Sequence, residues 1–176
     1  MRATIAAFAT LVGAVGVAAP VPAHALAQVT CSMDVSADFS PSLTTTHQDD
    51  VDVDFSGSGA CISLDFPLSQ RPVFVSMSAA MSADGTCINF DASGVMTTTW
   101  ILASGDSATS TIAIEPGDSP GSLTGVLSGV VIDGKYEGAT FLLTGLSDAI
   151  ADVLLECLTD GVSHVEGSDV LAVTDL

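Results

Sequence analysis

The sequence predicts an all-β protein, a single antiparallel domain of about eight strands with one short helix before the last strand. Apolar and polar residues alternate with period two along much of the chain, which is typical of strands that bury one face and expose the other. Segments rich in glycine, proline and aspartate separate these runs. Short connections of this kind favour antiparallel pairing between neighbours in the sequence.

The first three strands show the alternation most clearly. In residues 31–39 every odd position is apolar and every even position is polar. Valine and aspartate alternate in residues 50–54, and valine and methionine alternate with polar or small residues in residues 73–81. The pattern predicts strands at residues 28–39, 50–63 and 72–81, the last with an extension to residue 88.

Four strands rich in threonine and valine are expected next, at residues 95–103, 108–115, 122–132 and 135–144. Turn residues separate them. Between the last two, Asp133-Gly134 predicts a two-residue hairpin turn.

Residues 146–158 break the strand pattern. Apolar positions there recur three and four residues apart, Ser147 suits an N-cap and Gly161 follows the end, so a short helix is expected. The alternation resumes in a last strand at residues 165–174. Closing the strands into a barrel removes the sheet edges that an exported protein must otherwise protect, which favours a closed barrel over a two-sheet sandwich.

The N-terminus reads as a secretory signal peptide at residues 1–25, followed by a secreted acidic β domain at residues 26–176. Arg2 supplies a positive charge, an acid-free apolar run follows, and Ala23-His24-Ala25 forms a cleavage site. Acidic residues interrupt the most apolar later stretch, residues 139–158, so no stable membrane insertion of the mature chain is expected. We therefore expect a secreted protein that is extracellular or associated with the cell wall.

The mature domain is strongly acidic. It carries all 21 acidic residues of the chain against only Arg71 and Lys135, which leaves a net charge of −19. Such a surface repels nucleic acid and anionic lipid headgroups, so neither is expected as a partner. The charge favours solubility and association with cations or basic partners, and the sequence names no particular partner.

Four cysteines in an exported chain predict two disulfides, for which three connectivities exist. No C-x-x-C pair of the kind used by zinc sites is present. A hairpin centred near residue 46 places Cys31 opposite Cys61. We therefore expect the disulfide Cys31–Cys61, which leaves Cys87–Cys157 to tie the middle strands to the helix.

The densest acidic cluster is a weak calcium candidate formed by Asp49, Asp50, Asp52 and Asp54. The last three match the opening of a calcium-binding loop, but such a loop then needs a glycine and a glutamate that this chain lacks. The interleaved valines instead place these carboxylates on the solvated face of a strand. No metal site is expected unless neighbouring loops complete one.

No catalytic residues and no cofactor are predicted. Residues 117–121 are similar to the segment around the nucleophile of chymotrypsin-like proteases, but the sequence context of the catalytic base is missing around His47. Neither His47 nor His164 has a partner that the sequence reveals, so both are expected at the surface or at strand ends.

Several segments together carry a resemblance. They are the signal peptide, the strand that begins Thr30-Cys31-Ser32 and ends Phe39-Ser40-Pro41, the glycine-rich run that ends at Cys61, and Cys157 before the final strand. In these features the chain resembles uncharacterised small secreted all-β proteins of actinobacteria. The resemblance implies secretion and an all-β, disulfide-bonded domain, and it implies no activity.

Three classes of function remain open from the sequence. The first is a secreted non-enzymatic protein, barrel-like in fold, that acts at or outside the cell surface. The second is a carrier that binds a small apolar ligand inside the barrel, with Met33, Met77, Met81 and Met96 either lining a pocket or filling the core. The third is an enzyme of unrecognised type.

Overall fold

The computed structural model describes residues 27–114, 121–122, 126–144 and 150–174. The signal peptide expected at residues 1–25 lies outside the described residues, as does most of the protease-like segment 117–121. The described residues form strands β1 (Ala27–Leu43), β2 (Gln48–Ser63), β3 (Pro72–Gly85), β4 (Asn89–Leu102), β5 (Ser107–Ile114), β6 (Gly121–Ser122), β7 (Val126–Gly134), β8 (Thr140–Thr144) and β9 (Val162–Thr174). A 3-10 helix, η1 (Leu68–Gln70), lies between β2 and β3, and helix α1 (Ile150–Thr159) lies between β8 and β9.

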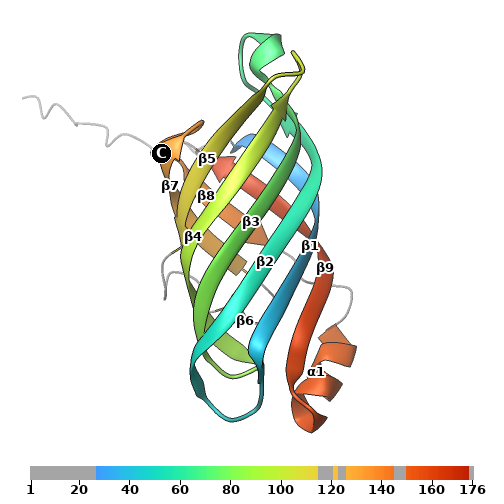
Figure 1. Ribbon diagram of the computed structural model, residues 1–176. Helices are drawn as coiled ribbons and strands as arrows, with labels where there is room; N and C mark the ends of the chain where they lie inside the picture. The colour runs from blue at the N-terminus through green and yellow to red at the C-terminus, as the bar shows by residue number, and fades with distance from the viewer. Residues whose placement is uncertain (1–26, 115–120, 123–125, 145–149, 175–176) are drawn as a thin grey trace, which may run out of the picture.

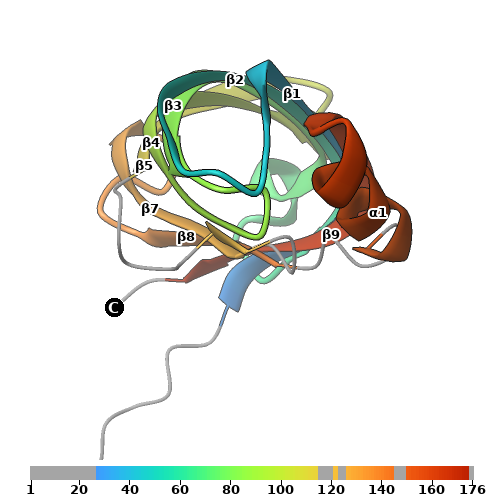
Figure 2. The same ribbon diagram turned by 90° about the horizontal axis from the view of Figure 1, so that it is seen from below.

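Eight strands close into a ring. Each pairs in antiparallel fashion with its neighbours in the order β1, β2, β3, β4, β5, β7, β8 and β9, and β9 pairs back onto β1. The short strand β6 pairs with the beginning of β4. Figures 1 and 2 show the closed ring from the side and from below, with α1 outside it next to β9. The fold class predicted from the sequence is confirmed: the sheet is one closed ring with a helix before the last strand.

The alternation sorts side chains between the inside and the outside of the ring. In β1, Val29, Cys31 and Met33 are buried, and the polar residues between them are exposed. Trp100 and Phe141 are the largest of the fully buried side chains. Burying a large apolar side chain contributes about 1.5–3 kcal/mol, so the inside of the ring is the core of the fold.

The turn between β7 and β8 differs from the expectation. The two-residue turn predicted at Asp133-Gly134 is wrong, because both residues continue β7 and pair with β5. The turn consists of residues 135–139, in which Tyr136 has a φ of 68° and Gly138 a φ of 87°. The expected strand 135–144 is accordingly reduced to β8.

Strand β4 begins earlier than expected, at Asn89, and pairs with β3 from Phe90 to Leu102. Gly94 makes this possible. Its φ is 153°, and a Cβ at this position would lie 3.0 Å from Cγ of Met81 on the neighbouring strand. The close approach of the two strands therefore requires a glycine here.

Helix α1 ends as expected from the sequence. Gly161 adopts a φ of 84°, and its amide donates to the carbonyl oxygen of Glu156 at 2.9 Å. This is the left-handed helix end that glycine favours. The expected N-cap, Ser147, lies outside the described residues.

The two ends of the ring carry different structures (Figure 1). The lower end holds the β1–β2 and β3–β4 turns and α1, with a disulfide between Cys87 and Cys157. The upper end holds the β2–β3 loop with η1, and the β4–β5 turn. Backbone amides of Ala103 and Ser104 donate to the carbonyl oxygens of Arg71 and Ser69, which attaches the loop to this turn.

Within the described part of the chain, no helix has the length and apolar character needed to cross a bilayer.

Candidate functional site

The upper end of the ring carries a group of exposed large apolar side chains, which we call the apolar rim. Its members come from the ends of β2, β3 and β4 and from the loop between β2 and β3: Ile62, Leu64, Phe66, Leu68, Val73, Phe74 and Ile101. Phe66 is 88% and Ile62 is 80% exposed. A group of exposed apolar side chains is a candidate interaction surface.

Asp65, between two rim residues, is held from the opposite side of the upper end. Its Oδ2 accepts hydrogen bonds from Nζ of Lys135 at 2.8 Å and from the hydroxyl of Tyr136 at 2.6 Å. Nε of Arg71 donates to the carbonyl oxygen of Asp65 at 2.7 Å. The β2–β3 loop is thereby bound to the β7–β8 turn. We call Asp65, Lys135 and Tyr136 the clasp.

Aromatic contacts connect the clasp to the core. The rings of Tyr136 and Trp100 meet edge to face with centroids 5.4 Å apart, and Nζ of Lys135 lies 4.4 Å from the centroid of the Tyr136 ring. Nε1 of Trp100 donates to Oγ of Ser110 at 2.9 Å, and Oγ of Ser110 donates to the carbonyl oxygen of Lys135. The only tryptophan, tyrosine and lysine of the chain therefore meet at one point.

Two residues of the clasp, Asp65 and Tyr136, have pKa values that are shifted away from neutral pH. Burial alone would raise the pKa of Asp65, but hydrogen bonds from Lys135 and Tyr136 outweigh it and lower that pKa. Burial, together with the adjacent Asp65 carboxylate, raises the pKa of Tyr136. Asp65 is therefore an anion and Tyr136 a neutral donor, an arrangement that positions the loop and is not tuned to transfer protons near neutral pH.

A depression of about 360 Å³ lies beside the clasp. The residues that line it combine the clasp with its neighbours on β1 and the loop: Gln28, Leu64, Asp65, Phe66, Gln70, Lys135 and Tyr136. The lining of the depression therefore combines charged side chains of the clasp with apolar side chains of the rim.

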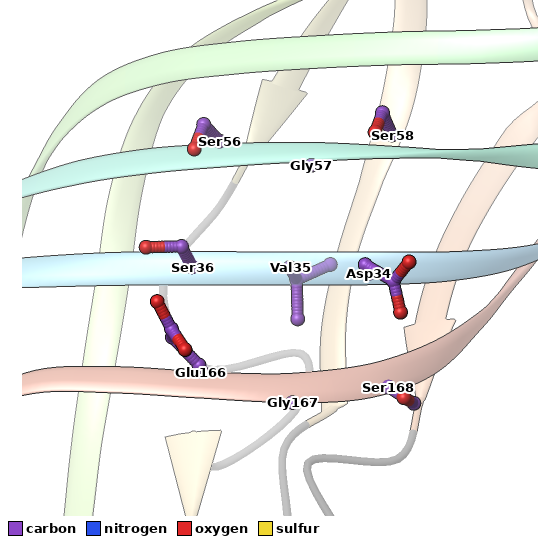
Figure 3. A pocket seen from close by; sticks show the side chains of 9 residues that line it. All are labelled: Asp34, Val35, Ser36, Ser56, Gly57, Ser58, Glu166, Gly167 and Ser168. Carbon is purple, nitrogen blue, oxygen red and sulfur yellow. The ribbon is translucent and has the colours of Figure 1, made fainter.

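A second candidate surface lies on the outer face of β9, β1 and β2. It is a depression of about 630 Å³ lined mainly by serine, glycine and acidic residues: Asp34, Val35, Ser36, Ser56, Gly57, Ser58, Glu166, Gly167 and Ser168. Figure 3 shows the three strands side by side, with the Glu166 side chain extending toward Ser36. A smaller depression of about 340 Å³ adjoins it at Ser56 and includes Asp38 and Asp54. We call these two depressions the acidic trough.

His164 pairs with two carboxylates at the edge of the trough. Its Nδ1 lies 2.7 Å from Oδ1 of Asp38, and its Nε2 lies 3.1 Å from Oε1 of Glu166. The hydrogen bonds with Asp38 and Glu166 raise the pKa of His164. The surface position expected for His164 is observed, and its acidic partners come from the neighbouring strand β1 and from β9 itself.

The four aspartates of the calcium candidate are all exposed, and they do not share a common set of contacts. Asp49 lies 3.0 Å from the ring of His47, and the amide of Asp50 donates to the carboxylate of Asp84 at 2.8 Å. Asp52 and Asp54 face outward from β2. Among the described residues, no three histidine, cysteine or acidic side chains are grouped in a way that could hold a metal ion.

One carboxyl group lies inside the ring. Asp169 on β9 is 5% exposed, and its Oδ1 has no hydrogen-bond partner within the described segments. Burial raises the pKa of Asp169 to about 6. Thr98 on β4 also has a buried hydroxyl without a partner there. Ser63 and Ser110 are buried as well, but among the described residues only the Asp169 and Thr98 side chains have a buried polar atom without a hydrogen-bond partner.

The four candidate methionines all lie in the core. Met33, Met77, Met81 and Met96 are at most 7% exposed. A Cβ at Gly57 would lie 3.3 Å from Cγ of Met77, just as the Cγ of Met81 lies against Gly94. Met77 and Met81 thus fill the space that glycines leave on neighbouring strands.

Cysteine pairing follows the expected connectivity. Cys31 and Cys61 are opposite each other in the β1–β2 register and form a disulfide, and a second disulfide joins Cys87 to Cys157. The first crosses two strands inside the ring. The second attaches α1 to the β3–β4 turn.

Sequence reasoning did not single out the clasp. Lys135 and Tyr136 fell within an expected strand, and Asp65 is 70 residues away from Lys135 in the sequence. The sequence signal that could have identified two of the three clasp residues is their rarity. The chain has a single lysine and a single tyrosine, and they are adjacent in the sequence.

Comparison of the chain with protein-family models, curated proteins and solved structures gives no significant match.

Proposed function

We propose that the chain is an exported, non-enzymatic protein that acts at or outside the cell surface by binding a partner through its apolar rim. The observation that carries this proposal is the rim itself. Phe66 is exposed in the loop that the clasp attaches to the β7–β8 turn, and Ile62 is exposed near the end of β2, where that loop begins. A pre-organised apolar surface loses little conformational freedom on binding, which favours its use as a docking site.

Two further features support action outside the cell. The N-terminal sequence has the pattern of a signal peptide, and both disulfides belong to the chemistry of oxidising compartments. Cys31–Cys61 lies within the ring and Cys87–Cys157 at its lower end. Both disulfides therefore stabilise the fold that presents the rim.

The carrier and the enzyme are weaker alternatives. Close contacts at Gly57 and Gly94 support a core-filling role for Met77 and Met81 over a pocket lining. In the clasp, the pKa of Asp65 is lowered and that of Tyr136 is raised, so both shifts move away from neutral pH and support positioning over proton transfer.

Binding to the producing cells tests the proposal. The mature protein is labelled and incubated with these cells, and the cell-bound fraction is measured for the wild type and for a Phe66→Ser/Leu68→Ser variant. A matched control, Leu155→Ser/Leu158→Ser, removes two exposed leucines from α1, which are 64% and 69% exposed. All four positions are exposed, and circular dichroism checks that each variant keeps its fold.

We expect the rim variant to lose most of its cell binding and the α1 variant to keep it. Equal binding of the rim variant and the wild type would contradict the proposal. Turnover in a broad hydrolase screen that survives purification would contradict the non-enzymatic part.

A further inference from the structure

The outer face of β2 changes in character along its length. From the lower to the upper end, its outward positions pass from carboxylates through hydroxyls to apolar side chains: Asp52, Asp54, Ser56, Ser58, Ala60 and Ile62. The intervening residues face the inside. One strand therefore has an acidic end and an apolar end on the same face.

The two strands that follow in the ring repeat this order. On β3 the outward positions run from Asp84 at the lower end, through serine and alanine, to Phe74 at the upper end. On β4 they run from Asp91, through Ser93, Val95 and two threonines, to Ile101.

The register aligns the three gradients. Asp84 pairs with Asp91 at the lower end, and at the upper end Phe74 pairs with both Ala60 and Ile101. Figure 1 shows the three strands side by side between the two ends. The acidic trough adjoins β2 on the side of β1, so the carboxylates of Asp34 and Asp38 extend the polar part of this face.

We infer that this face binds a polypeptide segment that is basic at one end and apolar at the other, with the apolar end on the rim and the basic end toward the trough. The inference rests on the proposed function and names the chemistry of its partner. A mature domain with a net charge of −19 attracts a basic partner. The apolar end of that partner packs on the rim, which fixes the orientation of the segment on the face.

The length of the face and its charge distinguish this occupant from others. The eleven residues from Asp52 to Ile62 span about 33 Å, at about 3.3 Å for each step along the strand. This length matches an extended segment of about ten residues and exceeds a small molecule. A second copy of the chain would bring the same excess of carboxylates to the contact, and the two copies would repel each other.

A synthetic peptide provides the probe. It has about ten residues, to match the span of the face, with leucine and phenylalanine in one half and lysine in the other. We call it the two-part peptide. In one control, the serine peptide, serine replaces the apolar half, and in another, the glutamate peptide, glutamate replaces lysine. Binding to the mature wild-type protein is measured by fluorescence anisotropy at low and at moderate salt.

Two variants test the two ends of the face. Ile62→Ser/Phe74→Ser alters the apolar end, and Asp52→Asn/Asp54→Asn alters the acidic end. Matched controls make the same kinds of change elsewhere. Val130→Ser/Ile132→Ser alters the exposed side of β7, and Asp133→Asn/Glu137→Gln alters one residue near the end of β7 and one in the β7–β8 turn.

The inference predicts that each test variant binds the two-part peptide about tenfold more weakly or worse, whereas both matched controls bind it like the wild type. The serine and glutamate peptides bind more weakly, and added salt weakens the two-part peptide. Wild-type affinity in the Asp52/Asp54 variant, or equal affinity for the serine peptide, would overturn the inference.

Failure here and failure of the proposed function give different results. Rim-dependent cell binding without affinity for the two-part peptide would overturn the basic segment as partner and leave the docking function standing. Cell binding that survives Phe66→Ser/Leu68→Ser would overturn the docking function whatever the peptide does.

Discussion

At the scale of single residues, Asp65 connects the rim to the rest of the molecule. Lys135 reaches Asp65 from a turn that is distant in the sequence. The Asp65 side chain is 14% exposed and the Lys135 side chain is 18% exposed. A charge this well shielded from water depends on its partner. The clasp therefore explains how a loop with exposed Phe66 keeps a defined conformation.

We predict that Asp65→Asn lowers the free energy of unfolding by about 1–3 kcal/mol at pH 7, because Lys135 loses its counter-charge. The pKa of Asp65 is lowered in the folded state, so its contribution is present at neutral pH and is lost as the pH falls through that pKa. The deficit of the variant should shrink below about pH 4. Urea unfolding followed by Trp100 fluorescence measures it, with Tyr136→Phe as the milder control at about 1 kcal/mol. A deficit that does not depend on pH would contradict this role.

The contribution of Asp169 to stability depends on pH in the opposite sense to that of Asp65. Burial raises its pKa to about 6, so the folded state holds a proton that the unfolded state releases. Stability from this group falls as the pH rises from about 4 through 6. We expect Asp169→Asn to be more stable than the wild type at pH 7, by about 1–3 kcal/mol, and to match it near pH 4. Melting temperatures measured across this range decide the point, and a variant less stable at pH 7 would show that Asp169 has a stabilising partner.

At the scale of elements, strand register could be predicted where alternation and a turn agreed. A hairpin centred near residue 46 placed Cys31 opposite Cys61, and the structure has this pairing. The turn at Asp133-Gly134 could not be predicted, because β5 is long enough to keep these residues in the ladder. Asp65 and Lys135 meet only because the ring closes, which no local pattern encodes.

The two disulfides act on different elements. Cys87–Cys157 attaches α1, whose described buried side chains are Val153 and Cys157, whereas Cys31–Cys61 joins two strands of the ring. We predict that Cys87→Ser/Cys157→Ser speeds hydrogen exchange in α1 and leaves β1 to β4 protected. Cys31→Ser/Cys61→Ser should lower the stability of the whole ring, by about 2–4 kcal/mol. Uniform loss of protection in the first variant would contradict this division.

At the scale of the whole molecule, the excess of carboxylates dominates. Repulsion among them opposes the compact state, and salt screens it. We predict that sodium chloride raises the melting temperature, and that calcium and magnesium at equal ionic strength raise it equally. Equal effects are expected because the Asp49 carboxylate already pairs with His47, Asp52 and Asp54 point outward, and the described residues hold no group of ligands suited to a metal ion. Stabilisation by millimolar calcium far beyond that by magnesium would reveal a site in this cluster.

We propose that the upper end of the ring is the surface that binds the partner. The most direct measurement places a photo-crosslinking p-benzoyl-phenylalanine at position 66 in one sample and at position 155 in another. Each labelled protein is irradiated on the producing cells, and the adducts are identified by mass spectrometry. We expect a defined adduct at position 66, formed with a partner segment that carries basic and apolar residues, and little adduct at position 155. Adducts mainly at position 155, or none at position 66, would contradict it.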